Sequence, residues 1–309
     1  MDIRPLTHAD LAQWSELLAA AFQRPQAEMC ALLGWMLTGY RLTAYGAWDS
    51  DRLAAQYSCI YTSLYVPGGF QHTLAGMSVN MATHPDYRGR GLIKQVSQPV
   101  YETLAAEGVA AGVGFSNAEG VQVDRHSKGY GYRVVGRLVP YAALVPPRRQ
   151  RTHTLQLSDT FCDHTQGFSW NRERICFSAS ACTVIQRFAH HPFRQYRFGI
   201  WEDSGQLCGV VVDRRVRGGV SLIAAHCTVE YSLRELLHRW LSSLEGERFV
   251  HLLASPNSSV RAALHAITPC IPLPYSRHPY YLTAKALQAD TSPAFFDFAR
   301  WDCIGGDIL

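Results

Sequence analysis

The residues best suited to chemistry form a glycine-rich segment, Arg-Gly-Arg-Gly at positions 88–91, which follows an expected strand through 77–83 and a Pro-Asp pair at 85–86. Glycines let the backbone curl, so that successive N–H groups point toward one spot. A helix that starts at this segment adds its own unpaired N–H groups and the positive end of its dipole. The segment therefore predicts a site for an anion such as a pyrophosphate.

Two familiar phosphate-binding loops do not fit this segment. The loop of nucleoside-triphosphate enzymes has Lys and then Ser or Thr after its second glycine, whereas Leu92 and Ile93 follow here. The dinucleotide-binding fingerprint requires a third glycine in a tight turn from strand to helix. The remaining alternative is an ordinary glycine-rich turn, and the agreement of position, order and flanking elements argues against it.

The anion site needs a strand before it and a helix after it, and the sequence predicts both. We expect a strand over about 72–83 and a helix over about 91–107, which Pro99 should kink or break near Gln98. The other elements expected in the first half are strands over 2–6, 42–48, 53–65, 109–115 and 132–144, and helices over 8–23, 26–38 and 118–128.

A proline- and arginine-rich stretch at 146–152 predicts a linker between two domains, 1–145 and 153–309. Beyond the linker a second alternating set of elements loosely echoes the first. It comprises strands over 196–202, 208–216, 220–227 and 249–254, and helices over 233–244 and 258–266. Such alternation predicts an α/β (α+β) fold class for both halves.

Composition excludes several other classes of protein. Apolar residues make up 47% and charged residues 17% of the chain, as in a globular protein with a sizeable core. The net charge of +4 is spread along the chain, so we expect no nucleic-acid partner. No apolar run approaches the roughly eighteen residues of a membrane helix, so we expect no membrane partner. The first residues, 1–5, do not resemble a signal peptide.

The cysteine pattern predicts a reducing, cytoplasmic location. The nine cysteines include no C-x-x-C pair, and most lie in apolar surroundings, so we interpret them as buried thiols. Neither His190-His191 nor Cys162 with His164 has the paired spacing of a zinc site. We therefore expect no metal.

The segment from 77 to 92 resembles the acyl-CoA-binding motif of the GNAT acetyltransferases, a strand followed by R/Q-x-x-G-x-G/A and most often dressed as P-x-Y-R-G-x-G. Residues 85–91, Pro-Asp-Tyr-Arg-Gly-Arg-Gly, match this form, and Ile93 replaces the family's last small residue. Residues 113–117 resemble the family's next strand with its asparagine, and 131–138 resemble its closing strand. The resemblance covers 1–145.

The resemblance implies a GNAT fold, a mixed central sheet flanked by helices, with a degenerate second GNAT-like domain that shapes the acceptor site. It implies an N-acyltransferase that moves an acetyl or other acyl group from acyl-CoA to the amine of a small metabolite, such as an amino sugar or an amino-acid-like molecule. The amine would attack the thioester directly in a ternary complex.

The implied cofactor site joins the glycine segment to the strand before it. Main-chain N–H groups of 88–92 would hold the pyrophosphate, and the pantetheine arm would pair with the strand edge at 81–83. An N–H near Asn80 or Met81 would stabilise the oxyanion. The predicted cofactor-binding residues are Met81, Ala82, Thr83, Arg88, Gly89, Arg90, Gly91, Leu92 and Asn117.

The acid and base are marked less clearly. Ser127 stands where the family often has a tyrosine, four residues before its G-F pair, and Tyr130 is the phenol that can substitute. The amine must lose a proton before attack, so a base is also needed. The base candidates are His84, Asp124, His126 and the chain's own carboxylate beyond the glycines at 305–306. The predicted catalytic residues are Tyr130, Ser127 and His84.

Two other interpretations stay open. Arg88, Arg90 and Lys94 would attract an acidic acyl carrier protein, which would then replace free CoA as the donor. A non-catalytic module that binds acyl-CoA would fit the loss of the family's tyrosine at 127. A carrier-dependent enzyme should bind free CoA poorly, so CoA binding distinguishes it from an acyl-CoA-dependent enzyme. Release of CoA with a panel of amines would rule out the non-catalytic module.

Overall fold

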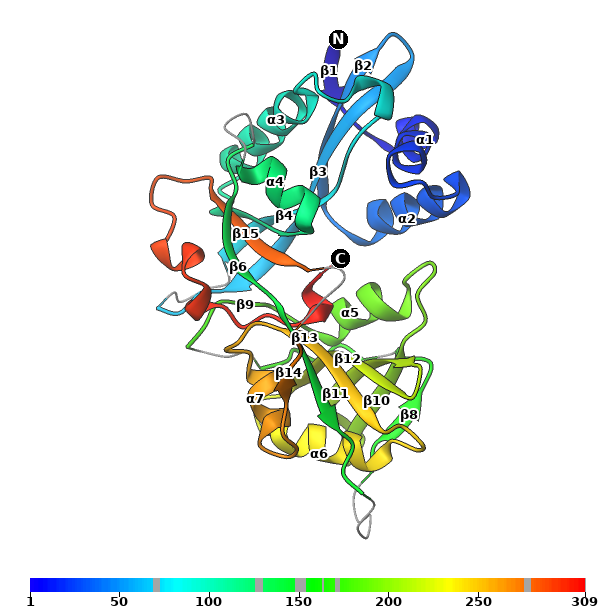
Figure 1. The fold of residues 1–309 in the computed structure, drawn as a ribbon, viewed down its shortest axis with the longest axis vertical. Helices are drawn as coiled ribbons and strands as arrows, with labels where there is room; N and C mark the ends of the chain where they lie inside the picture. Colours follow the sequence, from blue (N-terminus) through cyan, green and yellow to red (C-terminus); the bar gives the residue numbers. More distant parts are fainter. Residues whose placement is uncertain are drawn as a thin grey trace. The chain divides into compact units, whose positions relative to one another are not determined.

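The protein is described by a computed structural model in which the chain forms two compact units that interleave in sequence (Figure 1). The first unit comprises Met1–Leu64, His72–Gly136 and Tyr280–Phe296, and the second comprises Tyr65–Gln71, Arg137–Pro279 and Asp297–Leu309. The structure describes residues 1–68, 73–125 (backbone alone at 123–125), 130–147, 154–162, 164–169, 173–274 and 279–308.

A mixed sheet organises the first unit. Its strand order is β1-β2-β3-β4-β5-β15-β6, in which β4 and β5 are parallel while β1–β2, β2–β3, β3–β4 and β5–β15 are antiparallel. The strands are β1 (Asp2–Pro5), β2 (Leu42–Asp49), β3 (Arg52–Tyr65), β4 (Thr73–Thr83), β5 (Ala111–Ser116), β6 (Arg133–Arg137) and β15 (Tyr281–Ala286).

Helices cover both faces of this sheet (Figure 1). Trp14 and Leu18 of α1 and Leu33 of α2 share one apolar cluster with β2 and β3. Val96 and Val100 of α3 share another cluster with β3. The helices are α1 (Leu11–Phe22), α2 (Gln26–Gly39), α3 (Leu92–Ala106) and α4 (Ala118–Arg125), with short 3-10 turns at η1 (His8–Asp10), η2 (Pro85–Tyr87) and η4 (Pro293–Phe296).

The central strands β4 and β5 separate partway along their length. Their parallel register runs from Ala75↔Ala111 to Met77↔Val113, while β4 continues to Thr83. On its other side, β4 carries a bulge, because Ser58 pairs with Val79 but Gln56 pairs with Ala82. A bulge bends its strand and increases the local twist. The far half of β4 is therefore paired to β3 alone in this register.

The second unit has its own mixed sheet, of order β14-β7-β13-β12-β11-β10-β8. Its strands β12 and β13 are parallel, and its other neighbours are antiparallel. The strands are β7 (Val139–Leu144), β8 (Gln156–Ser158), β10 (Arg197–Asp203), β11 (Gln206–Val216), β12 (Gly219–Cys227), β13 (Phe249–Ala254) and β14 (Ile271–Pro272), besides the short β9 (Cys176–Phe177).

Helix α6 packs on this second sheet through an apolar face that includes Leu236, Trp240 and Leu241. The helices of the unit are α5 (Ala181–Val184), α6 (Leu233–Ser243) and α7 (Ser259–His265), with shorter turns at η3 (Ile185–Ala189), η5 (Phe298–Arg300) and η6 (Gly305–Asp307).

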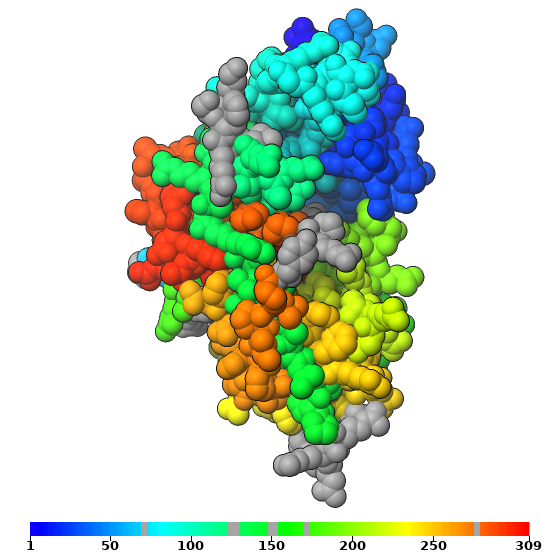
Figure 2. All heavy atoms as spheres, viewed as in Figure 1, coloured from blue at the N-terminus to red at the C-terminus, as the bar shows by residue number. Residues whose placement is uncertain are grey.

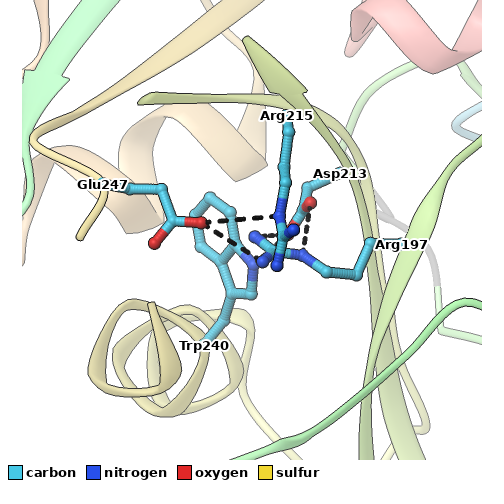
Figure 3. Close-up of polar contacts among 5 residues, drawn as sticks. All are labelled: Arg197, Asp213, Arg215, Trp240 and Glu247. Atoms are coloured by element: carbon cyan, nitrogen blue, oxygen red, sulfur yellow. Dashed lines mark hydrogen bonds and ion pairs between the residues drawn. The ribbon is translucent and has the colours of Figure 1, made fainter. Parts of the chain in front are cut away.

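A buried ion-pair cluster ties the strands of the second unit to α6 (Figure 3). Arg197 donates from Nε and Nη2 to Asp213 at 3.0 and 3.2 Å, and from Nη1 to Glu247 at 3.2 Å. The indole Nε1 of Trp240 donates to Asp213 at 2.7 Å. A cavity of about 310 Å³ adjoins Arg197 and Arg215. Because Arg197 already binds two carboxylates, we interpret the cluster as part of the fold rather than as an anion site.

The predicted fold class, α/β with a mixed central sheet flanked by helices, is confirmed. The single strand expected over 132–144 is wrong, because these residues form β6 in one sheet and β7 in the other. Of the kink or break expected at Pro99, the break does not occur, since α3 runs unbroken through it. Buried apolar side chains on both sides of the proline, such as Val96 and Leu104, hold the helix on the sheet and offset the lost hydrogen bond.

The division of the chain differs from the predicted domains 1–145 and 153–309 with a linker at 146–152. The chain passes between units at Gly136–Arg137, and β15 returns to the first unit from the region expected in the second. As a result, β15 lies between β5 and β6, while β7 lies between β13 and β14. Each half of the sequence thus contributes to the sheet built mainly by the other half.

Among the described residues, we find no helix with the length and apolarity needed to cross a bilayer. The same residues contain no cluster of three or more His, Cys, Asp or Glu side chains that would hold a metal ion.

Candidate functional site

The glycine-rich segment adopts a backbone that only glycine takes readily. Gly89 has φ +78° and Gly91 has φ +71°, both in the left-handed region. A Cβ added at either position would meet nothing within 4 Å, so conformation rather than crowding calls for glycine here. Gly91 is also the N-cap of α3, and no side chain caps this helix start. The first N–H groups of α3 therefore lack a side-chain cap, as an anion site requires.

Positive charge surrounds this helix start. The first turn of α3 carries no acidic residue. Arg90 is held in the loop, because its Nη2 donates to the Asp86 carbonyl at 3.2 Å and its guanidinium lies 4.8 Å from the Tyr87 ring centre. The exposed Arg88 and Lys94 have no side-chain hydrogen bond or ion pair with any residue that the structure describes. These two cations are thus available to a ligand.

The buried side chain of Tyr87 anchors the turn that precedes the glycines, η2. This side chain is 8% exposed, and its hydroxyl donates to Asp49 at 2.7 Å. The hydrogen bond to Asp49 and partial burial raise the pKa of Tyr87, so the phenol stays neutral. Arg52 lies 5.7 Å from the centre of the same ring. Side-chain contacts with Asp49 and Arg52 therefore hold this loop in place.

His84, a predicted catalytic residue, belongs to this same turn. Its Nδ1 accepts the N–H of Asp86 at 3.2 Å, and Arg52 lies 2.8 Å from its Nε2. One ring nitrogen thus contacts the turn and the other contacts Arg52 of β3, so the ring helps to set the path of the chain into residues 88–91.

The predicted strand residues lie on the part of β4 beyond its pairing with β5. Ala82 and Thr83 pair with Gln56 and Ala55 on β3, so the opposite edge of β4 faces away from β3. The side chain of Ala82 is buried, while those of Met81 and Thr83 are half-buried. Main-chain groups on this edge can pair with an extended ligand.

Tyr130, the predicted acid, lies next to β4. Its hydroxyl donates to Sδ of Met81 at 3.1 Å, and the residue is 6% exposed. Its carbonyl accepts from Nζ of Lys285 at 2.6 Å, across 155 residues of sequence. The structure thus brings together Tyr130 and Met81, two residues singled out for separate reasons.

Asn117 lies at the end of β5, as the motif implied, and caps α4. Its Oδ1 accepts the N–H of Gly120 at 2.8 Å, which leaves the amide nitrogen for other partners. Ser127 and His126 lie outside the described residues, as does Leu309 with the terminal carboxylate, and the side chain of Asp124 is likewise not described.

Sequence reasoning missed a group of tyrosines around Tyr130. The rings of Tyr57 and Tyr132 each lie 5.7 Å from that of Tyr130, and Tyr101 lies 5.4 Å from Tyr57. Burial raises the pKa of Tyr57, Tyr101 and Tyr132, which keeps all three phenols neutral. Burial also lowers the pKa of the neighbouring Lys285. The alternation of Tyr130 with Tyr132 was the local signal for a shared face.

Comparison with known proteins agrees with this geometry. Residues 2–133 match the family model of the acetyltransferase (GNAT) domain. No curated protein matches the chain.

Solved structures extend the likeness to nearly the whole chain. A protein of unknown function from Enterococcus faecalis V583, described as a probable N-acyltransferase, has 16% identity and a TM-score of 0.67, over 94% of this chain and 73% of that chain. A GCN5-related N-acetyltransferase from Kribbella flavida has 16% identity and a TM-score of 0.61, over 95% and 72%. Eis1 from Mycobacterium abscessus has 13% identity and a TM-score of 0.61, over 93% and 74%.

At these identities the structural likeness establishes the fold, and the fold is that of GCN5-related acyltransferases with a second α/β unit. Within it, residues 2–133, less than half of the chain, match the model of the acetyltransferase (GNAT) domain. Domains of this family take their acyl group from acetyl-CoA or another acyl-CoA.

Proposed function

We propose that the protein is an acyl-CoA-dependent N-acyltransferase that acts on the amine of a small metabolite, such as an amino sugar or an amino-acid-like molecule. One observation carries the proposal. The uncapped glycine start of α3 follows directly on a strand, β4, whose far half has left its parallel neighbour. An anion site and an unpaired strand edge in succession suit a pyrophosphate joined to an extended amide chain.

The pyrophosphate of CoA would be held by main-chain N–H groups from Arg88 to Leu92, with the free guanidinium of Arg88 as a counter-charge. The pantetheine amides would pair with β4 from Met81 to Thr83. The amide nitrogen of Asn117 would add a further hydrogen bond from the end of β5.

The reaction would form a C–N bond and break the C–S bond of the thioester. The N–H groups at Asn80 and Met81 would stabilise the oxyanion that develops as the neutral amine attacks. Tyr130, whose hydroxyl already contacts Met81, would protonate the departing thiolate. The amine loses its proton to water or to a base on the acceptor side.

Calorimetry with acetyl-CoA and free CoA, followed by thiol release with a library of amines, tests the proposal. We expect both ligands to bind and at least one small amine to release CoA. Poor binding of free CoA with turnover of an acylated carrier protein would instead favour the carrier-dependent enzyme. Tight binding without release across the library would favour a non-catalytic module.

The role of Tyr130 is tested separately with Tyr130→Phe, which keeps the ring packing and removes only the hydroxyl. We expect kcat to fall roughly 10²-fold with little change in acetyl-CoA affinity. Tyr132→Phe is the matched control, because this phenol packs in the same group but its hydroxyl lies over Gly112 of β5. Equal losses in the two variants would contradict the assignment.

A further inference from the structure

Gln56 is a buried amide that contacts the bulge of β4. It lies on β3 with no solvent exposure, and its Nε2 donates to the main-chain carbonyl of Asn80. Asn80 lies in the bulge, with φ +49°, in the left-handed region that asparagine tolerates better than most residues other than glycine. The side chain of Gln56 therefore holds the carbonyl of the bulged peptide.

The regular register of β3 with β4 is interrupted at this carbonyl. In the register of β3 with β4, Ser58 pairs with Val79 and Gln56 pairs with Ala82, so Asn80 and Met81 lie in the bulge between these pairs. The carbonyl of Asn80 has thus left the regular ladder. The amide of Gln56 donates to it from β3.

The direction of this carbonyl fixes the direction of an N–H group. In a planar trans peptide the C=O of one residue and the N–H of the next point in opposite directions. Holding the Asn80 carbonyl toward Gln56 on β3 therefore turns the Met81 N–H away from β3. On that side β4 has already parted from β5, since their register ends at Met77↔Val113.

The remaining atom of the amide argues against a purely structural role. Oε1 of Gln56 is buried and has no hydrogen-bond partner among the residues that the structure describes. A buried acceptor without a partner destabilises a fold, and an apolar side chain of the same size would avoid that cost. The contribution of Gln56 is then its N–H contact with Asn80.

We propose that Gln56 is a positioning residue, which aims the Met81 N–H at the acyl carbonyl oxygen of the bound thioester. This inference rests on the proposed function, because it specifies how the oxyanion donor of that reaction is set. Gln56 itself touches neither substrate nor cofactor.

The test uses acetyl-CoA labelled with ¹³C at the acyl carbonyl and infrared spectra of the binary complex, which need no acceptor amine. In the parent, the hydrogen bond should shift the labelled carbonyl band to lower frequency on binding. In Gln56→Leu most of that shift should disappear, while the dissociation constant for CoA stays within about twofold. With an active amine, kcat should fall at least roughly tenfold, less than the loss from deleting an oxyanion donor outright.

Ser58→Ala is the matched control. Ser58 Oγ donates to the carbonyl of Val79 at 2.9 Å, an equivalent buried contact from the same strand. Because Val79 keeps its register partner, this variant should retain the parent band shift and kcat. Gln56→Met serves in the same assay if Gln56→Leu does not give a cooperative thermal transition.

Gln56→Glu adds a readout that packing alone would not move. A protonated carboxyl group can donate to the Asn80 carbonyl, whereas a carboxylate cannot and repels it. The ratio of variant to parent kcat should therefore fall as pH rises. Equal band shifts in the parent and Gln56→Leu, or a ratio independent of pH, would overturn the inference while leaving the proposed function standing. Absence of saturable acetyl-CoA binding in the parent would overturn both.

Discussion

The two units contain the same succession of strand, helix and parallel strand, but only one of the two helices begins with an open end. Helix α3 follows β4 and starts at Gly91, without a side-chain cap and without an acid in its first turn. Helix α6 follows β12 and starts at Ser232, whose Oγ accepts the N–H of Glu235 at 3.2 Å. In the second unit the helix start is satisfied by the chain itself, and the acidic Glu235 disfavours an anion there.

The two units also differ beside their parallel strands. In the first unit β4 and β5 part after Met77. In the second unit the end of the chain lies beside the parallel strands, where Ile304 bridges to Ala254 of β13. Gly306 lies so close to β12 that a Cβ there would be 2.6 Å from the Ile223 carbonyl oxygen. The same succession of elements thus leaves an uncapped helix start and parting strands in one unit, and is closed by the chain's own contacts in the other.

The largest effect that sharpens this comparison is expected from Gly89→Glu. A carboxylate at the start of α3 would repel the pyrophosphate, and a side chain at φ +78° would strain the loop. We expect acetyl-CoA affinity measured by calorimetry to fall at least roughly 100-fold, or about 2.7 kcal/mol. Gly108→Glu is the control, since Gly108 has φ +76° and an equally open site beyond the other end of α3. Similar losses in the two variants would break the comparison.

A smaller effect is expected from neutralising the unpaired cation at α3. Arg88→Gln should weaken acetyl-CoA binding roughly five- to tenfold at low salt, because one exposed charge contact contributes on the order of 1 kcal/mol. The loss should shrink as ionic strength rises. Arg234→Gln, in the first turn of α6, should leave the affinity unchanged. An equal effect at Arg234 would show that the field of the whole molecule, not the α3 start, attracts the ligand.

The cap of α6 should matter for stability and not for binding. Ser232→Ala removes the acceptor for the Glu235 N–H and should lower the free energy of unfolding by about 1 kcal/mol in denaturant titrations. Acetyl-CoA affinity should match the parent. Binding of a second acetyl-CoA per chain would show instead that the Ser232 cap alone prevents ligand binding at the start of α6.

The smallest effect concerns pH and the segment beside β12. Burial raises the pKa of Asp307 to about 7, with Arg187 and Asp302 as charged neighbours. Because this pKa lies above its value in the unfolded chain, the folded state holds the extra proton between about pH 4 and 7, and stability falls as pH rises through that range. Asp307→Asn should raise the unfolding free energy at pH 8 relative to pH 5 by roughly 0.5–1 kcal/mol, since part of the side chain stays exposed. If the difference in unfolding free energy between Asp307→Asn and the parent is the same at pH 5 and pH 8, Asp307 is not the cause of the pH dependence.

The parts of the fold that local pattern determines could be predicted from the sequence. The run from 85 to 92 predicted a turn, a curled backbone at its two glycines and a helix start, because each of these features depends on residues a few positions apart. The structure shows each of them, including the positive φ of Gly89 and Gly91. Most helices and strands of both halves also lie within a few residues of their expected bounds.

The features that depend on distant residues could not be predicted in this way. The position of β15 between β5 and β6 rests on pairs such as Leu282 with Phe115, and no local pattern encodes that pairing. The contact of Lys285 with Tyr130 follows from it. The role of Gln56 was hidden for a similar reason, since a lone glutamine in an apolar strand gives no sign of the bulge opposite it.

The exchange of β7 and β15 also constrains how the chain is made. During synthesis from the N-terminus, β5 and β6 emerge long before the strand that belongs between them, so this edge of β5 waits unpaired until residue 286 has left the ribosome. A nascent chain of the first 145 residues would therefore carry its glycine-rich loop on an incomplete sheet. We therefore expect this strand arrangement to increase the need for chaperones during translation, before it has any effect on activity.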